Sequence, residues 1–253
     1  MQSPFPSSDS FAVEGYKPQP FPEMLWPVLS KLDLKLMDTY LGYDVTTLRN
    51  IKTPMVEGYM MIWAVDKVKR LSLSHLVFMK RMVFSEVGMG PNEDYDFPLF
   101  SSELVENPAN AHFLADMHAM RDIVIDTWYR EKYLDPLDSI WKEYQDVNND
   151  INPNPWYRAF QSPYSISGRH KPQDGDRSFF PRIIECLVKY LEYYIGNVLP
   201  QATPIESPEV KEYVKKRKYS IMEQYRTLDP GAGPIMKSLG IEEGKKLLEV
   251  LFS

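Results

Sequence analysis

The chain has 253 residues, of which 43% are hydrophobic, and a net charge of −6, which suits one substantial hydrophobic core. The acidic balance argues against a nucleic-acid-binding protein, because such domains usually carry a basic face. Cys186 is the only cysteine, so an internal disulfide and a CxxC metal site are excluded and we expect a cytoplasmic protein. The apolar runs are too short to span a bilayer, so no membrane partner is expected.

Residues 1–20 are rich in Pro and Ser and have neither a basic nor an apolar region typical of a signal or transit peptide. They predict a mobile N-terminal segment, followed by a single domain over residues 21–253. An amphipathic helix is expected over Glu23–Leu34. Strands are then expected over Met55–Val65 (with Gly58 at a bulge or bend), Leu71–Phe84 (one or two strands), Phe97–Leu104 and His112–Met117. A loop over Gly88–Asp94 and a turn over Asn107–Asn110 join them.

The second half of the chain is mainly helical by pattern. Helices are expected over Asp135–Asp146, over Arg177–Val198 and from Ser207 to about Thr227, with one more strand in Trp156–Arg169. A turn at Asp229–Gly231, a short helix and a final helix after Gly240 close the chain. Strands first and helices mostly afterwards predict an α+β domain, a three-layer α/β/α sandwich whose central antiparallel sheet is flanked by helices on both faces.

Two carboxylates stand out. Glu103 shares a strand face with Phe97, Leu99 and Ser101, because side chains alternate along a strand. A carboxyl group among apolar neighbours is either a salt-bridged structural residue or a proton-transfer group with a raised pKa. The structural role is the commoner one for a lone Glu. Asp229 precedes Pro230, which is typical of a turn or cap residue.

Standard catalytic and metal motifs are missing from the sequence. The histidines, His75, His112, His118 and His170, show no HxH or HExxH spacing, so no metal site is expected. No Gly-rich phosphate loop or GxSxG motif is present, and Cys186 lies in an apolar helix as a core thiol. The 16 Tyr, 12 Phe and 5 Trp suit a pocket for a large flat ligand. The basic run Lys215–Lys218 is either a solvated helix face or a patch that steers an acidic partner.

The C-terminal quarter resembles the ferredoxin-dependent bilin reductases. The ordered pattern is Lys218-Tyr219, Asp229-Pro230-Gly231, Leu239-Gly240 and Leu251-Phe252. Upstream, the family's aromatic and acidic residues followed by Pro-x-Phe-Gly-x-Asp-Leu correspond to Tyr95–Leu104. The Asp-Leu or Asp-Phe pair on the family's next strand corresponds to Asp116-Met117. Gln161-Ser162-Pro163, followed by Arg169, is similar to a later family stretch. The resemblance extends in order and spacing from about Ser10 to the end of the chain.

This resemblance implies radical reduction of an open-chain tetrapyrrole, with no bound metal or flavin, single electrons from reduced ferredoxin and protons from pocket carboxylates. It carries the catalytic roles over to Asp229 and to Glu103, which occupies the position of a central-strand Asp. Arg169 and Lys218 are candidates for holding bilin propionates or docking ferredoxin, and Lys80 and Ser101 are further candidates for contacting the bilin.

The chain also departs from the family pattern. Ser101 replaces a Gly, and Ser74 and Lys80 stand where phycocyanobilin-forming members have a Glu and a His, so that specificity is not expected. A Glu in place of the central Asp also occurs in red chlorophyll catabolite reductases, whose following stretch is similar to Met120–Val124.

We therefore expect ferredoxin-dependent reduction of biliverdin or a dihydrobiliverdin to a phytobilin. The alternatives are a red chlorophyll catabolite reductase-like enzyme and a non-catalytic bilin-binding or carrier protein. The expected partners are ferredoxin and a bilin, and a downstream bilin-accepting protein is left open.

Overall fold

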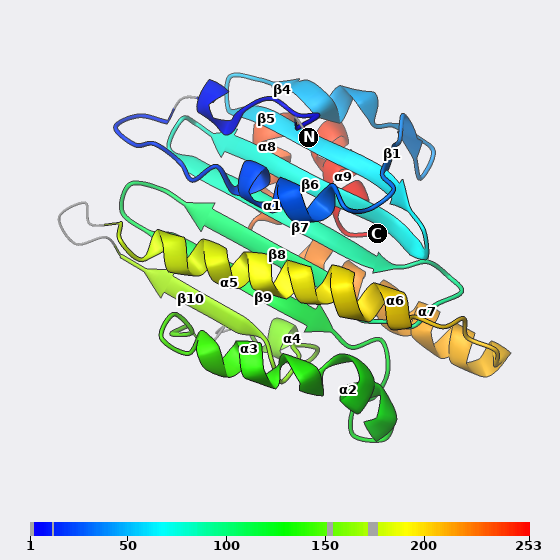
Figure 1. Ribbon diagram of the computed structural model, residues 1–253. Helices are drawn as coiled ribbons and strands as arrows, with labels where there is room; N and C mark the ends of the chain where they lie inside the picture. The colour runs from blue at the N-terminus through cyan, green and yellow to red at the C-terminus, as the bar shows by residue number, and fades with distance from the viewer. Residues whose placement is uncertain (1–2, 12, 151–153, 172–176) are drawn as a thin grey trace.

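The computed structural model describes residues 3–11, 13–150, 154–171 and 177–253, and its central feature is one large antiparallel sheet (Figure 1). The strands run in the order β1-β5-β6-β7-β8-β9-β10, with β4 also paired to β5. Their bounds are β1 Lys35–Leu36, β4 Ile51–Lys52, β5 Val56–Val65, β6 Val68–Phe78, β7 Met82–Pro91, β8 Leu99–Glu106, β9 Ala111–His118 and β10 Ile166–His170. Strands β5 to β9 are consecutive in the chain and adjacent in the sheet, which confirms the predicted meander. A separate small hairpin pairs β2 (Thr39–Tyr40) with β3 (Tyr43–Asp44).

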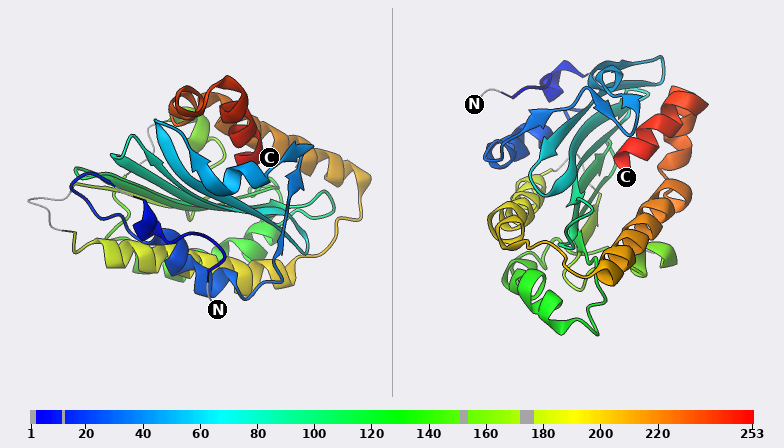
Figure 2. Two further views of the ribbon diagram at one scale, coloured as in Figure 1. Left: turned by 90° about the horizontal axis from the view of Figure 1, so that it is seen from above. Right: turned by 90° about the vertical axis from the view of Figure 1, so that its right-hand side faces the viewer.

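Helices cover both faces of this sheet (Figure 2). On one face lie α1 (Phe21–Leu29) and α5 (Phe180–Tyr193), which continues as a π-helical turn over Tyr194–Val198. On the other face lie α7 (Pro208–Leu228), α8 (Ala232–Leu239) and α9 (Ile241–Leu251). The shorter helices are α2 Thr127–Tyr133, α3 Asp138–Glu143, α4 Pro155–Arg158 and α6 Leu199–Gln201. The predicted three-layer α/β/α sandwich is confirmed.

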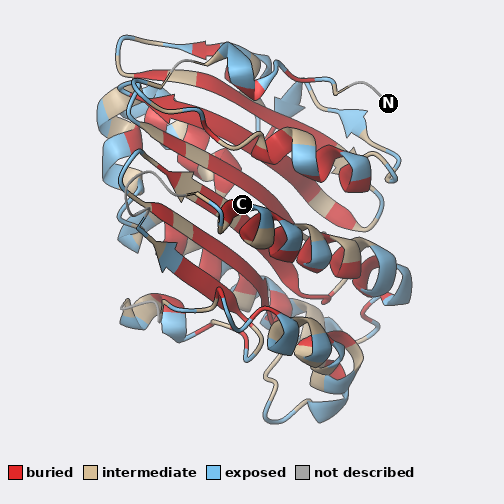
Figure 3. Cartoon of the chain, turned by 60° about the vertical axis from the view of Figure 1, so that its left-hand side comes forward, coloured by how far each residue is buried: buried red, intermediate tan, exposed pale blue. Residues whose placement is uncertain are grey.

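The long strands are buried along most of their length, because each face packs against helices (Figure 3). On β6, Leu71 and Leu73 belong to the core beneath α1 and α5, whereas Leu76 packs with the α8–α9 cluster. A strand buried on both faces lacks clean alternation of apolar and polar residues. This is why the sequence left the number of strands in 71–84 open.

Several local expectations need correction. Phe97 precedes β8 and packs in the core beneath α5 with Phe100, so it does not share the face of Glu103. The predicted loop from Gly88 is strand up to Pro91. The segment Trp156–Arg169 contributes one strand, β10, which confirms that prediction. The short helix α4 before it was not predicted, although Pro155 favours the first turn of a helix.

Gly58 lies in regular strand pairing and not at a bulge. It is in register with Ile51 on β4 and Leu76 on β6. A Cβ atom at this position would lie 2.0 Å from the His75 carbonyl oxygen, and the backbone φ is 142°. Glycine is therefore required by close backbone approach between the strands. The bulge of β5 falls between Trp63 and Val65.

The N-terminal segment lies against the domain where it is described. The ring of Phe5 contacts Trp26 and Tyr59 at centroid distances of 5.6 and 5.5 Å. The backbone N–H and hydroxyl of Ser8 each donate to Glu23 at 2.6 Å. These contacts fix the path of the described residues, and the mobility of residues 1–20 stays a prediction. No helix in the described part of the chain combines the length and apolar character that a bilayer span needs.

Candidate active site

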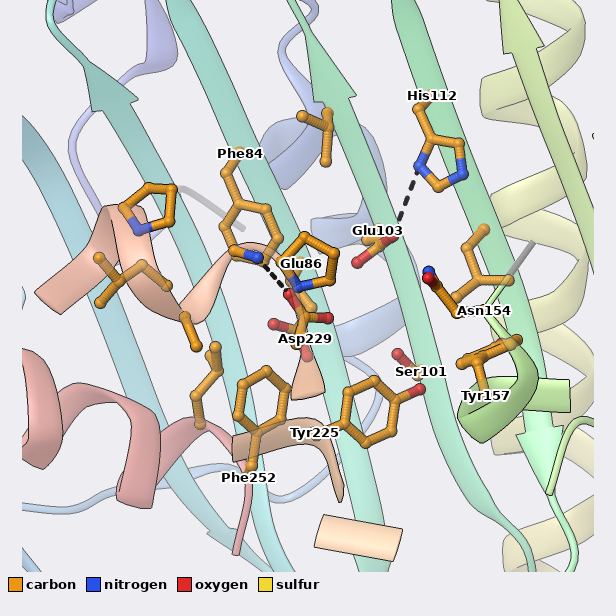
Figure 4. A pocket seen from close by; sticks show the side chains of 18 of the residues that line it. Phe84, Glu86, Ser101, Glu103, His112, Asn154, Tyr157, Tyr225, Asp229 and Phe252 are labelled. Atoms are coloured by element: carbon orange, nitrogen blue, oxygen red, sulfur yellow. Dashed lines mark hydrogen bonds and ion pairs between the residues drawn. The ribbon is translucent and has the colours of Figure 1, made fainter. Parts of the chain in front are cut away.

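A cavity of about 380 Å³ lies between the sheet and the C-terminal helices (Figure 4). Its floor is formed by side chains of β6 to β10, and its cover comes from α7, the loop at 229–231, α8 and the end of α9. Phe84, Val105, Leu114, Ile235 and Phe252 contribute apolar surface. The polar residues of the wall are Glu86, Ser101, Glu103, His112, Asp150, Asn154, Tyr157, Arg169, Tyr225 and Asp229. Volume and lining suit a small-molecule site in which several polar groups converge within a partly apolar wall.

Three carboxyl groups meet in this cavity because of strand register and one loop. Glu86 on β7 is directly opposite Glu103 on β8, so both side chains project from the same face of the sheet. Asp229 approaches from the other side, as the residue that ends α7. Its Oδ1 accepts a hydrogen bond from the Gly231 N–H at 2.6 Å, which fixes the loop over the cavity. Figure 4 shows the three side chains directed into the same space.

Burial and mutual repulsion favour the neutral forms of these groups. Burial is the main cause that raises the pKa of Glu103 to about 8, and the charges of Asp229 and Glu86 raise it further. Burial also raises the pKa of Glu86 to about 7, against the opposing effect of the Arg70 guanidinium. The pKa of Asp229 is raised by burial, and its hydrogen bond from Gly231 opposes the shift. Glu103 can therefore hold a proton near neutral pH and release it to a basic ligand atom.

A row of titratable side chains continues from Glu103 to the rim of the cavity. His112 Nδ1 lies 3.6 Å from Glu103 Oε1, and His112 Nε2 lies 3.7 Å from Asp150 Oδ2. Arg169 reaches the same Asp150 oxygen at 3.5 Å, and its side chain is 55% exposed. Burial lowers the pKa of His112, and the Arg169 charge adds to this effect, whereas the Asp150 carboxylate opposes it. In the described ranges, no group of three or more His, Cys, Asp or Glu side chains is arranged to hold a metal ion.

A comparison with protein-family models shows the family of this chain. The family model described as "Ferredoxin-dependent bilin reductase" matches residues 41–253. The chain belongs to this family. It is a ferredoxin-dependent bilin oxidoreductase, and the match includes each of the strands β5 to β10 and the helices that enclose the cavity.

Two relatives support this assignment at different levels. The phycoerythrobilin:ferredoxin oxidoreductase of Gloeobacter violaceus is 23% identical over 234 residues, covering 88% of this chain and 89% of that protein. The crystal structure of phytochromobilin synthase from tomato, in complex with biliverdin, matches with a TM-score of 0.75 at 14% identity, covering 89% of this chain and 78% of that one. The second match shows that this bilin reductase shares the fold of the tomato protein.

Four of the six predicted site residues line the cavity, namely Glu103, Asp229, Ser101 and Arg169. Lys80 does not, because it lies exposed in the turn between β6 and β7 with a φ of 54°. Its contact with a bilin stays a prediction that this cavity does not support. Lys218 is also elsewhere: it is only 6% exposed on α7, and its ammonium group donates to the Pro91 carbonyl at 3.1 Å and to Glu93 at 3.3 Å.

Glu86 is the main site residue that the sequence prediction missed. The predicted strand stopped at Phe84, so Glu86 had no face assigned to it. A hairpin centred on Lys80 would have paired Glu86 with Ser74, as observed, and the next hairpin would have paired it with Glu103. Met79 and Lys80 have positive φ in that turn. Hairpin turns of this kind usually carry Gly or Asn, so the sequence did not reveal the turn. His112 was weighed only as a metal ligand, which hid its place beside Glu103.

The raised carboxyl pKa values predict that the bilin reductase loses stability as pH rises. Glu86 holds its proton to about pH 7 in the folded protein but only to about 4.5 when unfolded. The stability that Glu86 contributes is therefore fully present below about pH 4.5 and is lost as pH rises through 7. Between about pH 4.5 and 7, the Glu86 carboxyl lowers the free energy of unfolding by up to about 1.4 kcal/mol per pH unit. Glu86→Gln should remove this contribution. Urea unfolding at pH 5 and 7.5 measures the effect, with the exposed Glu131→Gln as control. Parallel pH profiles for wild type and Glu86→Gln would contradict it.

Proposed function

We propose that this protein reduces biliverdin or a dihydrobiliverdin to a phytobilin, by sequential one-electron transfers from ferredoxin and proton donation from Glu103 and Asp229. The observation that carries the proposal is the convergence of Glu103, Glu86 and Asp229 on one apolar cavity. The name of the Gloeobacter relative supports a phytobilin as product, and the biliverdin bound in the tomato protein supports biliverdin as ligand. In this proposal the chain holds no cofactor of its own.

Proton supply is the part of the reaction that the protein must provide. Reduction of one double bond consumes two electrons, delivered by two reduced ferredoxins, and two protons. Each added electron makes the conjugated ligand more basic, so a neutral acid beside it can complete the step. Glu103, with a pKa raised to about 8, is protonated at neutral pH. It donates from the sheet, whereas Asp229 donates from the loop after α7, so the two acids reach the ligand from different sides.

Arg169 is proposed to hold a bilin propionate at the rim. Its guanidinium is more than half exposed and is oriented by Asp150 at 3.5 Å, and a guanidinium suits a carboxylate ligand. We expect Arg169→Ala to weaken biliverdin binding about 10-fold, as for loss of one hydrogen bond to a charged group. Titration of bilin absorbance measures this, with Lys80→Ala as the control outside the cavity. Unchanged affinity in Arg169→Ala would remove the residue from the binding site.

Ferredoxin is proposed to dock on the outer side of α7. A surface hollow there is lined by the basic residues Lys69, Lys215, Lys216, Lys218 and Arg226 and by the acidic residues Glu93 and Glu212. Basic residues outnumber acidic residues in this hollow, which favours an acidic partner. Met222 lies in the wall of the hollow, and Tyr225, one turn later on α7, lines the bilin cavity. Electrons that arrive at this surface therefore have only a thin layer of side chains to cross.

The test is anaerobic incubation with biliverdin, or with a dihydrobiliverdin, in the presence of reduced ferredoxin and a regenerating system. Loss of the substrate absorbance and appearance of a more reduced bilin is the expected result. A bilin that binds without any spectral change on reduction would favour a carrier. Turnover of a chlorophyll catabolite alone would favour a red chlorophyll catabolite reductase-like activity.

A further inference from the structure

A second chain of polar groups leads from the protein interior to the same cavity. Asp116 and His118 lie two residues apart on β9, so both project from the face that carries Glu103. Both side chains are completely buried. His118 Nδ1 lies 3.2 Å from Asp116 Oδ2, and His118 Nε2 lies 2.9 Å from the hydroxyl of Tyr225. Tyr225 belongs to α7 and lines the cavity, as Figure 4 shows.

The inner end of this chain is firmly anchored. Asp116 accepts hydrogen bonds from the Tyr157 hydroxyl at 3.0 Å, from the Met117 N–H at 2.7 Å and from the Ser162 N–H at 3.3 Å. The outer end is fixed by stacking, because the ring of Tyr225 lies on Phe252 with centroids 5.0 Å apart and an interplanar angle of 12°. Asp116, His118 and Tyr225, which come from two elements far apart in sequence, are thus held next to one another between the core and the cavity.

The chemistry of each member suits proton transfer. A histidine beside a carboxylate can carry a proton on each ring nitrogen, one facing the carboxylate and the other available for transfer. Burial and the nearby Asp116 and Glu103 carboxyls raise the pKa of Tyr225 well above its ordinary value. The phenol is therefore a neutral O–H and a weak acid by itself. It can donate effectively only if His118 supplies a replacement proton at the same time.

We propose that Tyr225 is a third proton donor to the bilin, used when a second double bond is reduced and more than the two protons of Glu103 and Asp229 are needed, with His118 as its proton source and Asp116 as the residue that positions His118. This rests on the proposed function. The Tyr225 O–H bond breaks as the proton joins the reduced ligand, and the proton on His118 Nε2 moves to the Tyr225 oxygen. The nitrogen Nδ1 of His118 keeps its proton toward Asp116, and Nε2 takes up a new proton from the cavity through the Tyr225 hydroxyl after the product leaves. This path carries protons only, since the two electrons for each double bond come from reduced ferredoxin.

The experiment compares Tyr225→Phe with wild type in anaerobic single-turnover reduction of biliverdin by reduced ferredoxin, followed by absorbance and electron paramagnetic resonance. Tyr225→Phe keeps the ring that stacks on Phe252 and removes only the hydroxyl. Bilin affinity should stay within about 3-fold, and reduction should slow by about 10- to 100-fold, toward the lower end of general acid effects. A one-electron-reduced bilin radical should persist, because the electron arrives and the proton lags.

His118→Gln should reproduce the persistent radical while Tyr225 remains, and the double variant should be no slower than the slower single variant. Tyr194→Phe controls for loss of a buried hydroxyl, since Tyr194 donates to the Pro98 carbonyl at 2.9 Å beneath α5, away from the cavity. Wild-type rate and radical decay in Tyr225→Phe would overturn the relay alone. A wild-type protein that binds bilins and reduces none would overturn both the relay and the proposed function.

Discussion

Glu103→Gln should bind biliverdin normally and reduce it about 10² to 10⁴-fold more slowly, the range in which a positioned general acid contributes. The amide has the size of the protonated carboxyl and fits the same place between His112 and Glu86. It cannot release a proton to the ligand. Because the native side chain is largely neutral near pH 7, with a pKa of about 8, the substitution changes proton supply more than local charge.

Single-turnover reduction with excess reduced ferredoxin measures this effect apart from binding. Glu103→Asp should recover part of the rate, since it restores the carboxyl on a shorter side chain. The exposed Glu131→Gln is the matched control for a Glu-to-Gln change outside the cavity. A Glu103→Gln enzyme with the wild-type rate and products would mean that this carboxyl is structural.

Asp229→Asn should also slow reduction by about 10² or more, and it should change the product pattern in a different way from Glu103→Gln. The Asn carbonyl can still accept the hydrogen bond from the Gly231 N–H, so the loop keeps its geometry. Only the proton is lost from the loop side of the ligand. Chromatography of products and intermediates from the two variants shows whether each acid serves a different protonation.

Asp44→Asn is the matched control for this change. Asp44 accepts from the Thr46 N–H at 2.9 Å, the same two-residue spacing as Asp229 to Gly231, but it lies exposed in the β2–β3 hairpin. It should leave activity unchanged. Identical products and rates in Asp229→Asn and wild type would confine Asp229 to a capping role at the end of α7.

Placement of Glu103 and Asp229 on their secondary-structure elements was possible from sequence because the chain pattern around them is local. Glu103 lies in a strand with turn residues on one side, and Asp229 follows a helix with a clear N-cap at Ser207 and precedes a proline. Both could be placed from their neighbours alone. The local pattern did not reveal that Lys80 lies in a turn, because the hairpin turn from Met79 to Arg81 contains no Gly, Pro or Asn. An error in that turn was enough to hide Glu86.

The sequence by itself determined the order of the long strands and helices, the antiparallel sheet with helices on both faces, the lack of standard metal and nucleotide motifs, and the two acids that match the family. These features depend on short-range periodicity and on ordered residues along the chain. Only the tertiary structure decided which groups meet. Strand register set Glu86 against Glu103, and packing of α7 on β9 brought Tyr225 to His118, 107 residues away. The packing of α7 also buried Lys218. Contacts between distant segments could not be predicted, because they leave no periodic pattern in the sequence.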